Sequence, residues 1–263
     1  HYLSKPMLVT GPQLNVWRAP LDNDGIKGWE GQDNKPLGRW KKAGIDKPNM
    51  QYEPMRVEGL GSRKLTLHFQ QTAVMRGGSI RVDTQYQFGK DDSLVVRHHF
   101  MIDKTLPDLP RIGVRLELPA GFEHLQWFGR GPHETYIDRR SAGVIAHHYS
   151  TVSNQYVPYI LPQDHGNLTD IRWLKVCTDD GSSLKVSADQ IIEASASHYP
   201  HELLTPAFHT YEVAPQANTW LCLDAMQRGV GGASCGPDTL DQYRVHPKEY
   251  HLNYRLTAEP REP

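Results

Sequence analysis

Two neighbouring stretches of this sequence alternate apolar and polar residues so regularly that they are incompatible with a helix. Their apolar-side positions are Ile80, Val82, Thr84, Tyr86 and Phe88, followed by Leu94, Val96, His98, Phe100 and Ile102. A period of two places one set of side chains on each face of a β-strand. Residues 89–93, GKDDS, have turn composition, so the two stretches predict a long antiparallel hairpin.

The same alternation recurs along the rest of the chain. It covers Ile112, Val114, Leu116 and Leu118, then Leu174, Val176, Leu184 and Val186, and finally Tyr250, Leu252, Tyr254 and Leu256. Helical periodicity is confined to residues 36–44, enough for one or two turns. With 22 glycines and 19 prolines between short strands, the sequence predicts an all-β protein. No linker or repeat divides it, so we expect residues 1–263 to form one large two-sheet antiparallel sandwich.

Net charge and cysteine content limit the kinds of partner and the cellular location expected for this chain. The formal net charge of −1 gives no reason to expect nucleic acid or an anionic membrane, and no apolar run is long enough to span a bilayer. Cys177, Cys222 and Cys235 form no C-x-x-C pair, which favours mostly buried, reduced thiols and a cytoplasmic location. Because the sequence starts at His1, we expect an excised domain, and a periplasmic or secreted location stays open.

Paired histidines raise the question of a metal site. His98 and His99 are adjacent, as are His147 and His148. Neighbouring strand residues point to opposite faces, so neither pair can converge on one ion without help from elsewhere. We therefore expect no metal in this chain and interpret His98 as a core histidine.

Residues 18–24, RAPLDND, form a compact acidic cluster. Oxygen ligands at alternating positions suit Ca²⁺ or Mg²⁺, but the glutamate that completes an EF-hand is missing. A turn in which Asp and Asn side chains bond their own backbone is favoured. A third use, in which Arg18 and the carboxylates lock two segments together or face a sugar, stays open.

Residues 127–140, WFGRGPHETYIDRR, hold the best candidates for acid–base chemistry. Glu134 and Asp138 are the kind of carboxylate pair that glycoside hydrolysis uses, with His133 beside them. The alternative is a scaffold turn, shaped by Gly129, Gly131 and Pro132, whose charges pair with one another. We favour the scaffold turn.

Two further motifs point to loops. The glycine-rich residues 229–236, GVGGASCG, have neither dinucleotide-binding nor phosphate-loop spacing and predict a surface loop between strands. Residues 167–169, NLT, match the N-glycosylation pattern, which matters only in a secreted protein. No G-x-S-x-G nucleophile motif occurs.

Three of these segments, together with residues 159–167, occur in the same order as in a known family. WRAPLDND (17–24), WFGRGPHETYIDRR (127–140), YILPQDHGN (159–167) and GVGGASCGPD (229–238) together resemble the C-terminal, small-chain domain of glycoside hydrolase family 2 β-galactosidases. The resemblance runs from about residue 15 to about residue 257. It implies a β-supersandwich like that of galactose mutarotases, with the first strand or strands trimmed here.

The resemblance also implies a division of labour. The family's catalytic glutamates and its Mg or Na ions belong to a separate (β/α)₈ barrel, whose strand–helix alternation is absent from this chain. This chain would then have no catalytic residue and no cofactor of its own. It would complete the galactoside cleft of a barrel domain or large subunit, within an oligomeric enzyme.

Candidate site residues follow from the same resemblance. The cleft loop comprises Ser234, Cys235, Gly236 and Asp238. Cys235 stands about where the family has an aromatic residue, which puts sugar stacking there in question. Residues expected at an interface or facing sugar are Arg18, Asp22, Asn23, Asp24, His133, Glu134, Asp138 and Arg139.

Two other functions remain open at this point. A carbohydrate-binding module would use exposed tryptophans, although most of the six lie in strand-like runs and are expected in the core. An aldose mutarotase would need an acid and a base flanking the sugar ring, for which His98, His133, Glu134 and Asp138 are the available groups.

Overall fold

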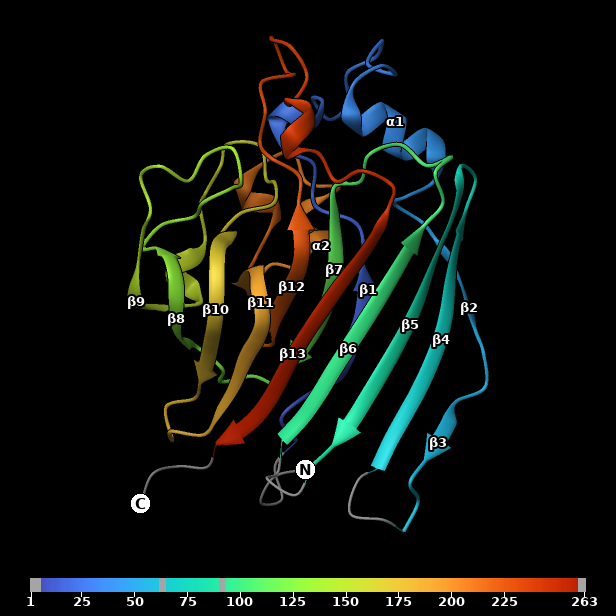
Figure 1. Cartoon of the computed structure of the whole chain (residues 1–263). Coiled ribbons are helices and arrows are strands. Elements are labelled where there is room, and N and C mark those ends of the chain that lie inside the picture. The colour runs from blue at the N-terminus through green and yellow to red at the C-terminus, as the bar shows by residue number, and fades with distance from the viewer. Residues whose placement is uncertain (1–5, 62–64, 90–92, 260–263) are drawn as a thin grey trace.

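The computed structural model describes residues 6–61, 65–89 and 93–259 (Figure 1). Its strands are β1 (Thr10–Asn15), β2 (Asn49–Tyr52), β3 (Arg56–Glu58), β4 (Leu65–Met75), β5 (Gly78–Phe88), β6 (Ser93–Ile102), β7 (Arg111–Leu118), β8 (His124–Gly131), β9 (Val144–Thr151), β10 (Leu168–Cys177), β11 (Ser183–Ser197), β12 (Thr219–Gln227) and β13 (Glu249–Glu259). The helices are α1 (Pro36–Ala43) and α2 (His201–Leu204), with 3-10 turns η1 (Asp22–Asp24), η2 (Ser153–Gln155), η3 (Thr210–Glu212) and η4 (Asp241–Tyr243). The all-β, antiparallel prediction is confirmed.

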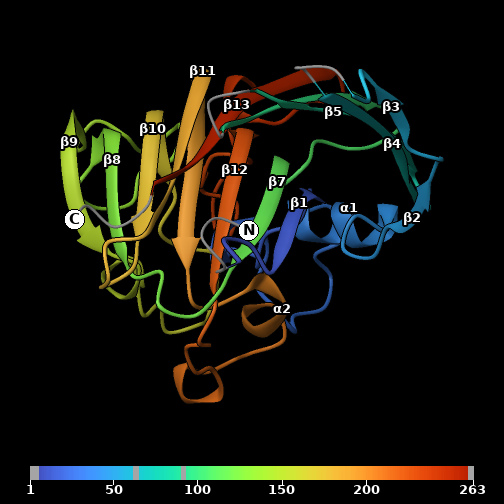
Figure 2. The ribbon, with the colours of Figure 1, turned by 90° about the horizontal axis from the view of Figure 1, so that it is seen from below.

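Hydrogen bonds join these strands into one curled sheet. Its main order is β1-β7-β12-β11-β13-β6-β5-β4-β2, and β10, β8 and β9 continue from the other side of β11. Seen from below, the layer containing β13, β5 and β4 arches over the layer containing β12, β7 and β1 (Figure 2). The sandwich expected from the sequence is therefore present, and its two facing layers are joined into one curled sheet.

The long strand β11 is what connects the two layers. Ser183–Ala188 pairs with β13, and Glu193–Ser197 pairs with β12. Ile171 of β10 pairs with Ile192 and Trp173 pairs with Ser187, so a step of two residues on β10 matches a step of five on β11. Residues 188–191 of β11 therefore form a bulge. A bulge bends a strand and increases its twist, which lets one strand belong to both layers.

The predicted hairpin is β5–β6, and its register is regular. Ile80 lies opposite Ile102 and Phe88 opposite Leu94. Most inward positions are buried, but Tyr86 and Leu94 are only partly buried and Phe88, at the strand end, is 39% exposed. Part of the predicted turn, residues 90–92, lies outside the described residues.

The core lies between the layers and forms one continuous cluster. The other alternating runs contribute to this cluster as predicted. Leu174 of β10 pairs with Val186 of β11, and the apolar positions of β13 are all buried, namely Tyr250, Leu252, Tyr254 and Leu256. Helix α1 ends at Gly44, which adopts the left-handed conformation, and it buries Trp40 edge-on against Trp17. No helix within the described ranges has the length and apolar character needed to cross a membrane.

Candidate functional site

The four sequence motifs meet at one end of the molecule, where strands β1, β6 and β12 finish (Figure 1). Residues 18–24 follow β1, and residues 132–143 connect β8 to β9. Residues 156–167 lead into β10, and residues 228–248 connect β12 to β13. Because antiparallel strands return to the same edge, segments far apart in the sequence become neighbours there.

Arg18 holds the first motif against the glycine-rich loop. Its guanidinium donates to Asp24 through Nη2 at 2.6 Å and Nε at 3.0 Å, and to the carbonyl of Arg228 at 2.6 Å. Arg18 and Asp24 are both fully buried. Burial opposes the charge, but Asp24 outweighs it and raises the pKa of Arg18. Asp24 also accepts the amide of Leu21 at 3.0 Å, so the expected turn and the expected segment lock both occur.

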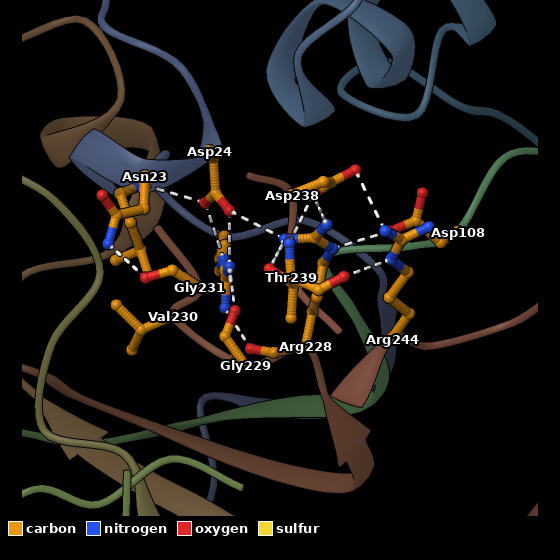
Figure 3. Close-up of polar contacts among 12 residues, drawn as sticks. Asn23, Asp24, Asp108, Arg228, Gly229, Val230, Gly231, Asp238, Thr239 and Arg244 are labelled. Atoms are coloured by element: carbon orange, nitrogen blue, oxygen red, sulfur yellow. Dashed lines mark hydrogen bonds and ion pairs between the residues drawn. The ribbon is translucent and has the colours of Figure 1, made fainter. Parts of the chain in front are cut away.

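A second buried arginine continues this network across the loop (Figure 3). Arg228 donates to Asp108 at 2.6 Å, to Thr239 at 2.6 Å and to Asp238 at 2.5 Å. Burial works against ionisation of Asp238, but the bond and charge of Arg228 lower its pKa overall. The guanidinium carbons of Arg18 and Arg228 each lie 5.8 Å from the Trp40 ring centre. Trp40 thus contributes cation–π contacts to both arginines.

Asp138 has a different role from the one expected. It does not join an arginine network but accepts the amides of Val230 at 2.9 Å and Gly231 at 2.8 Å. Gly229 fits against the same carboxylate, because a Cβ at that position would lie 2.6 Å from the carboxylate carbon. The β8–β9 loop therefore fixes the backbone of the glycine-rich loop.

Glu134 positions a neighbouring group of side chains. It accepts from Arg139 at 2.7 Å, from the amide of Gly166 at 2.9 Å and from the hydroxyl of Tyr159. Desolvation and this contact raise the pKa of Tyr159, so its hydroxyl stays protonated as the donor. The expected pairing of acids with arginines in this motif is met here.

These supports surround a cavity of about 260 Å³. Its walls come from all four motifs, namely Leu21, Asp22, Asn23, Tyr136, Arg139, Tyr159, Gln163, Val230 and Ser234. Asn23 donates to the carbonyl of Gly231 at 2.6 Å and accepts from Ser234 at 2.7 Å, which ties two of the walls together. The lining is polar and apolar in equal measure, and its polar atoms include both donors and acceptors.

Tyr136 is the one cavity residue with an unmet hydrogen bond. Its side chain is 2% exposed, and its hydroxyl has no partner among the described residues. Burial, reinforced by Asp164, raises its pKa well above the ordinary value, so it remains a neutral donor. An unpaired buried hydroxyl costs roughly 1–3 kcal/mol. The hydroxyl is closed off from solvent in this structure, and only a polar group that reached it would recover that cost.

The sequence-predicted residues divide into three groups. Asp22, Asn23, Arg139 and Ser234 line the cavity, whereas Arg18, Asp24, Glu134, Asp138 and Asp238 lie behind it as supports. Cys235, Gly236 and His133 are exposed and do not line it. Tyr136, Tyr159 and Gln163 were not singled out, although they belong to the quoted motifs.

Two other sequence interpretations are decided by burial. Asn167 is fully buried and donates to Glu193 at 2.7 Å, so the folded chain cannot present it as a glycosylation acceptor. His98 is also buried, between Thr84 at 2.9 Å and the hydroxyl of Tyr254 at 3.1 Å. Burial lowers its pKa to about 3, which keeps it neutral and confirms it as a core histidine.

Cysteines and tryptophans follow the expected trend with one exception each. Cys177 and Cys222 are buried, but Cys235 is exposed on the glycine-rich loop. Trp17, Trp40 and Trp127 are buried, whereas Trp29 is 69% exposed. A single exposed indole in the described ranges offers little surface for carbohydrate stacking.

Comparison with known proteins identifies the family. The model of the β-galactosidase small chain matches residues 1–256. The chain belongs to the β-galactosidase small-chain family. The β-galactosidase of Vibrio cholerae serotype O1 is 33% identical over 264 residues, covering 96% of this chain and 24% of that protein. That of Actinobacillus pleuropneumoniae is 29% identical over 244 residues, covering 92% and 23%.

This small-chain domain thus spans about a quarter of the length of the curated relatives it matches. Solved structures of similar shape include a family 36 α-galactosidase from Geobacillus stearothermophilus, with a TM-score of 0.43 and 11% identity over 81% of this chain and 28% of that one. An aldose epimerase homologue from C. elegans has a TM-score of 0.38 and 11% identity over 80% of this chain and 70% of that one.

Proposed function

We propose that this chain is the non-catalytic part of a β-galactosidase and that its motif-lined end faces the catalytic part. The observation that carries the proposal is the cavity lined by Tyr136, on which the four segments that carry the small-chain resemblance converge. Its floor is fixed by buried ion pairs, so its shape is set before anything binds. Preorganised polar walls of this kind favour binding over structural packing.

The chemistry of the lining suits a hydroxyl-rich ligand or a polar loop of the catalytic part. Tyr136 offers a donor, and Asn23, Ser234 and Gln163 combine donor and acceptor atoms. Arg139 and Asp22 add charge of both signs at the rim. A terminal galactoside in the adjoining cleft is the substrate we propose, with catalysis performed by residues outside this chain.

The test uses a chimera. In the Vibrio cholerae β-galactosidase, the segment that matches this chain is replaced by residues 1–263, and hydrolysis of a nitrophenyl β-galactoside is measured. We expect the chimera to be active, the enzyme without the segment to be inactive, and the 263-residue chain alone to show no turnover. Robust turnover by the chain alone, or full activity without the segment, would contradict the proposal.

A point variant tests the cavity itself. Tyr136→Phe in the chimera removes one hydroxyl and should raise KM about tenfold, the effect of losing about 1.4 kcal/mol of binding. Tyr86→Phe is the matched control, because Tyr86 packs against Phe69 on the arched layer. If both variants keep the parent KM and kcat, the cavity does not contribute to the active enzyme.

A further inference from the structure

A second group of polar residues lies far from the cavity motifs, on the outer face of the arched layer. His99 of β6 and His251 of β13 are directly opposite each other in register. Both belong to the alternating positions that point away from the core, since His98, Phe100, Tyr250 and Leu252 are buried. Glu249 lies two residues before His251 and therefore points to the same side.

The three side chains converge. Their ligand atoms all lie within 4.8 Å of one another, and Nε2 of His99 is 2.9 Å from a carboxylate oxygen of Glu249. The two imidazoles stack with ring centres 4.4 Å apart and planes 12° from parallel. From the sequence, His98 and His99 were expected not to bind a metal without ligands from elsewhere. Here Glu249 and His251 of β13 are such ligands for His99.

We propose that His99, Glu249 and His251 form a binding site for a divalent transition-metal ion of the zinc class. Zinc binds imidazole nitrogen at about 2.0–2.1 Å, which sets neighbouring tetrahedral ligand atoms about 3.3 Å apart. The side chains reach that spacing when the two rings turn out of their parallel stack. Because Glu249 is 68% exposed and His99 31% exposed, the surrounding packing leaves them room to turn.

The surroundings leave space for the remaining ligands of the ion. A cavity of about 390 Å³ borders both histidines, so water can complete the coordination. Asp83 of β5 lies opposite His99 on the same face, where it accepts from Gln70 at 2.8 Å and from Arg81 at 3.2 Å. Two imidazoles and one carboxylate select zinc-like ions over Mg²⁺, which prefers oxygen ligands.

The experiment measures Zn²⁺ affinity of the 263-residue chain by competition with a chromophoric chelator. The wild-type chain should bind one Zn²⁺ ion at this site more tightly than at any other site. His251→Ala or Glu249→Gln should weaken that binding at least tenfold. His124→Ala is the matched control, because His124 also bonds a carboxylate, Asp179 at 2.7 Å, and lies at the exposed start of β8. Its affinity should stay within twofold of wild type.

Thermal unfolding gives an independent readout. Zn²⁺ should raise the Tm of wild type and of the His124 variant, while an equal concentration of Mg²⁺ should not. All variants are read in chelator first, so a folding defect appears as a lower Tm without metal. Equal Zn²⁺ affinity in wild type and both site variants would overturn the proposal, as would a Tm that does not respond to Zn²⁺.

Discussion

Buried charged side chains in this protein are grouped so that nearly every ion has several partners. Arg111 is an example, with Asp224 at 3.1 Å through Nε and Asp164 at 3.4 Å through Nη1. Glu193 is different, because its partners are neutral: the amide of Asn167 at 2.7 Å and the backbone amide of Gln227 at 3.0 Å. Hydrogen bonds favour its charged form, but burial dominates and raises its pKa to about 7.

This raised pKa makes stability depend on pH. Between pH 4.5 and about 7 the folded state binds more protons at Glu193 than the unfolded state does. The contribution of Glu193 to the free energy of unfolding should therefore be largest below pH 4.5 and fall by roughly 3 kcal/mol as the pH rises through 7. Burial also raises the pKa of Asp224 to about 6, which adds a change of the same sign.

Glu193→Gln isolates the contribution of Glu193. In this variant the free energy of unfolding should decline much less with rising pH. At low pH the variant should be less stable than wild type by about 1 kcal/mol, because one hydrogen of the new amide faces another donor. Urea unfolding at several pH values between 4.5 and 8 measures both effects. Glu30→Gln, at an exposed position, should keep the wild-type profile. A Glu193→Gln profile that parallels wild type would show that this carboxyl is charged throughout.

Among the elements, β7 and β12 approach each other closely at Gly113. Gly113 of β7 lies opposite Asp224 of β12, beside the Arg111–Asp224 ion pair. A Cβ at Gly113 would be 2.2 Å from the carbonyl oxygen of Leu223 and 2.4 Å from the Asp224 carboxylate. Only glycine allows the strands to approach this closely while the ion pair stays intact.

Gly113→Ala should therefore destabilise the fold by about 3 kcal/mol or more, since backbone atoms must move apart. Gly11→Ala in the neighbouring strand β1 is the control, because nothing lies within 4 Å of its added Cβ. Denaturant unfolding compares them, and the control should change by less than about 0.5 kcal/mol. Equal stability of the two variants would mean that the β7–β12 contact is more yielding than the structure indicates.

Alternation in the sequence predicted those strands that have one face in the core. The hairpin β5–β6 and strand β13 are of this kind, and so are the paired ends of β10 and β11. Strand β12 was missed because it is buried on both faces and therefore carries no period. The bend in β11 could not be predicted, because the bulge at residues 188–191 depends on which strands pair on either side.

The candidate site was predictable only in part for a related reason. Its motifs were visible because they concentrate glycine, proline and charge, and the resemblance placed them together. Which residues face the cavity depends on how the loops stack. Tyr136, which the sequence did not single out, lines the cavity, whereas Asp138 does not. The sequence shows Asp138 as a candidate acid, but its carboxylate is occupied by two backbone amides.

At the scale of the whole molecule, the two layers share a strand and a single hydrophobic cluster. Neither layer can separate without exposing the core of the other. We expect one cooperative unfolding transition, with tryptophan fluorescence and far-ultraviolet circular dichroism changing together. Trp40 in α1 and Trp127 in β8 report on distant parts of the fold. Two resolved transitions would show that the layers are independent units.

The position of β13 has a consequence for how the chain is made. It is the final strand of this sequence, yet in the sheet it lies between β6 and β11. While a ribosome is still extending the chain, β6 and the first half of β11 each present an unpaired edge. Such edges recruit other strands, including those of neighbouring nascent chains. Synthesis of residues 249–259 is therefore the step that pairs both edges.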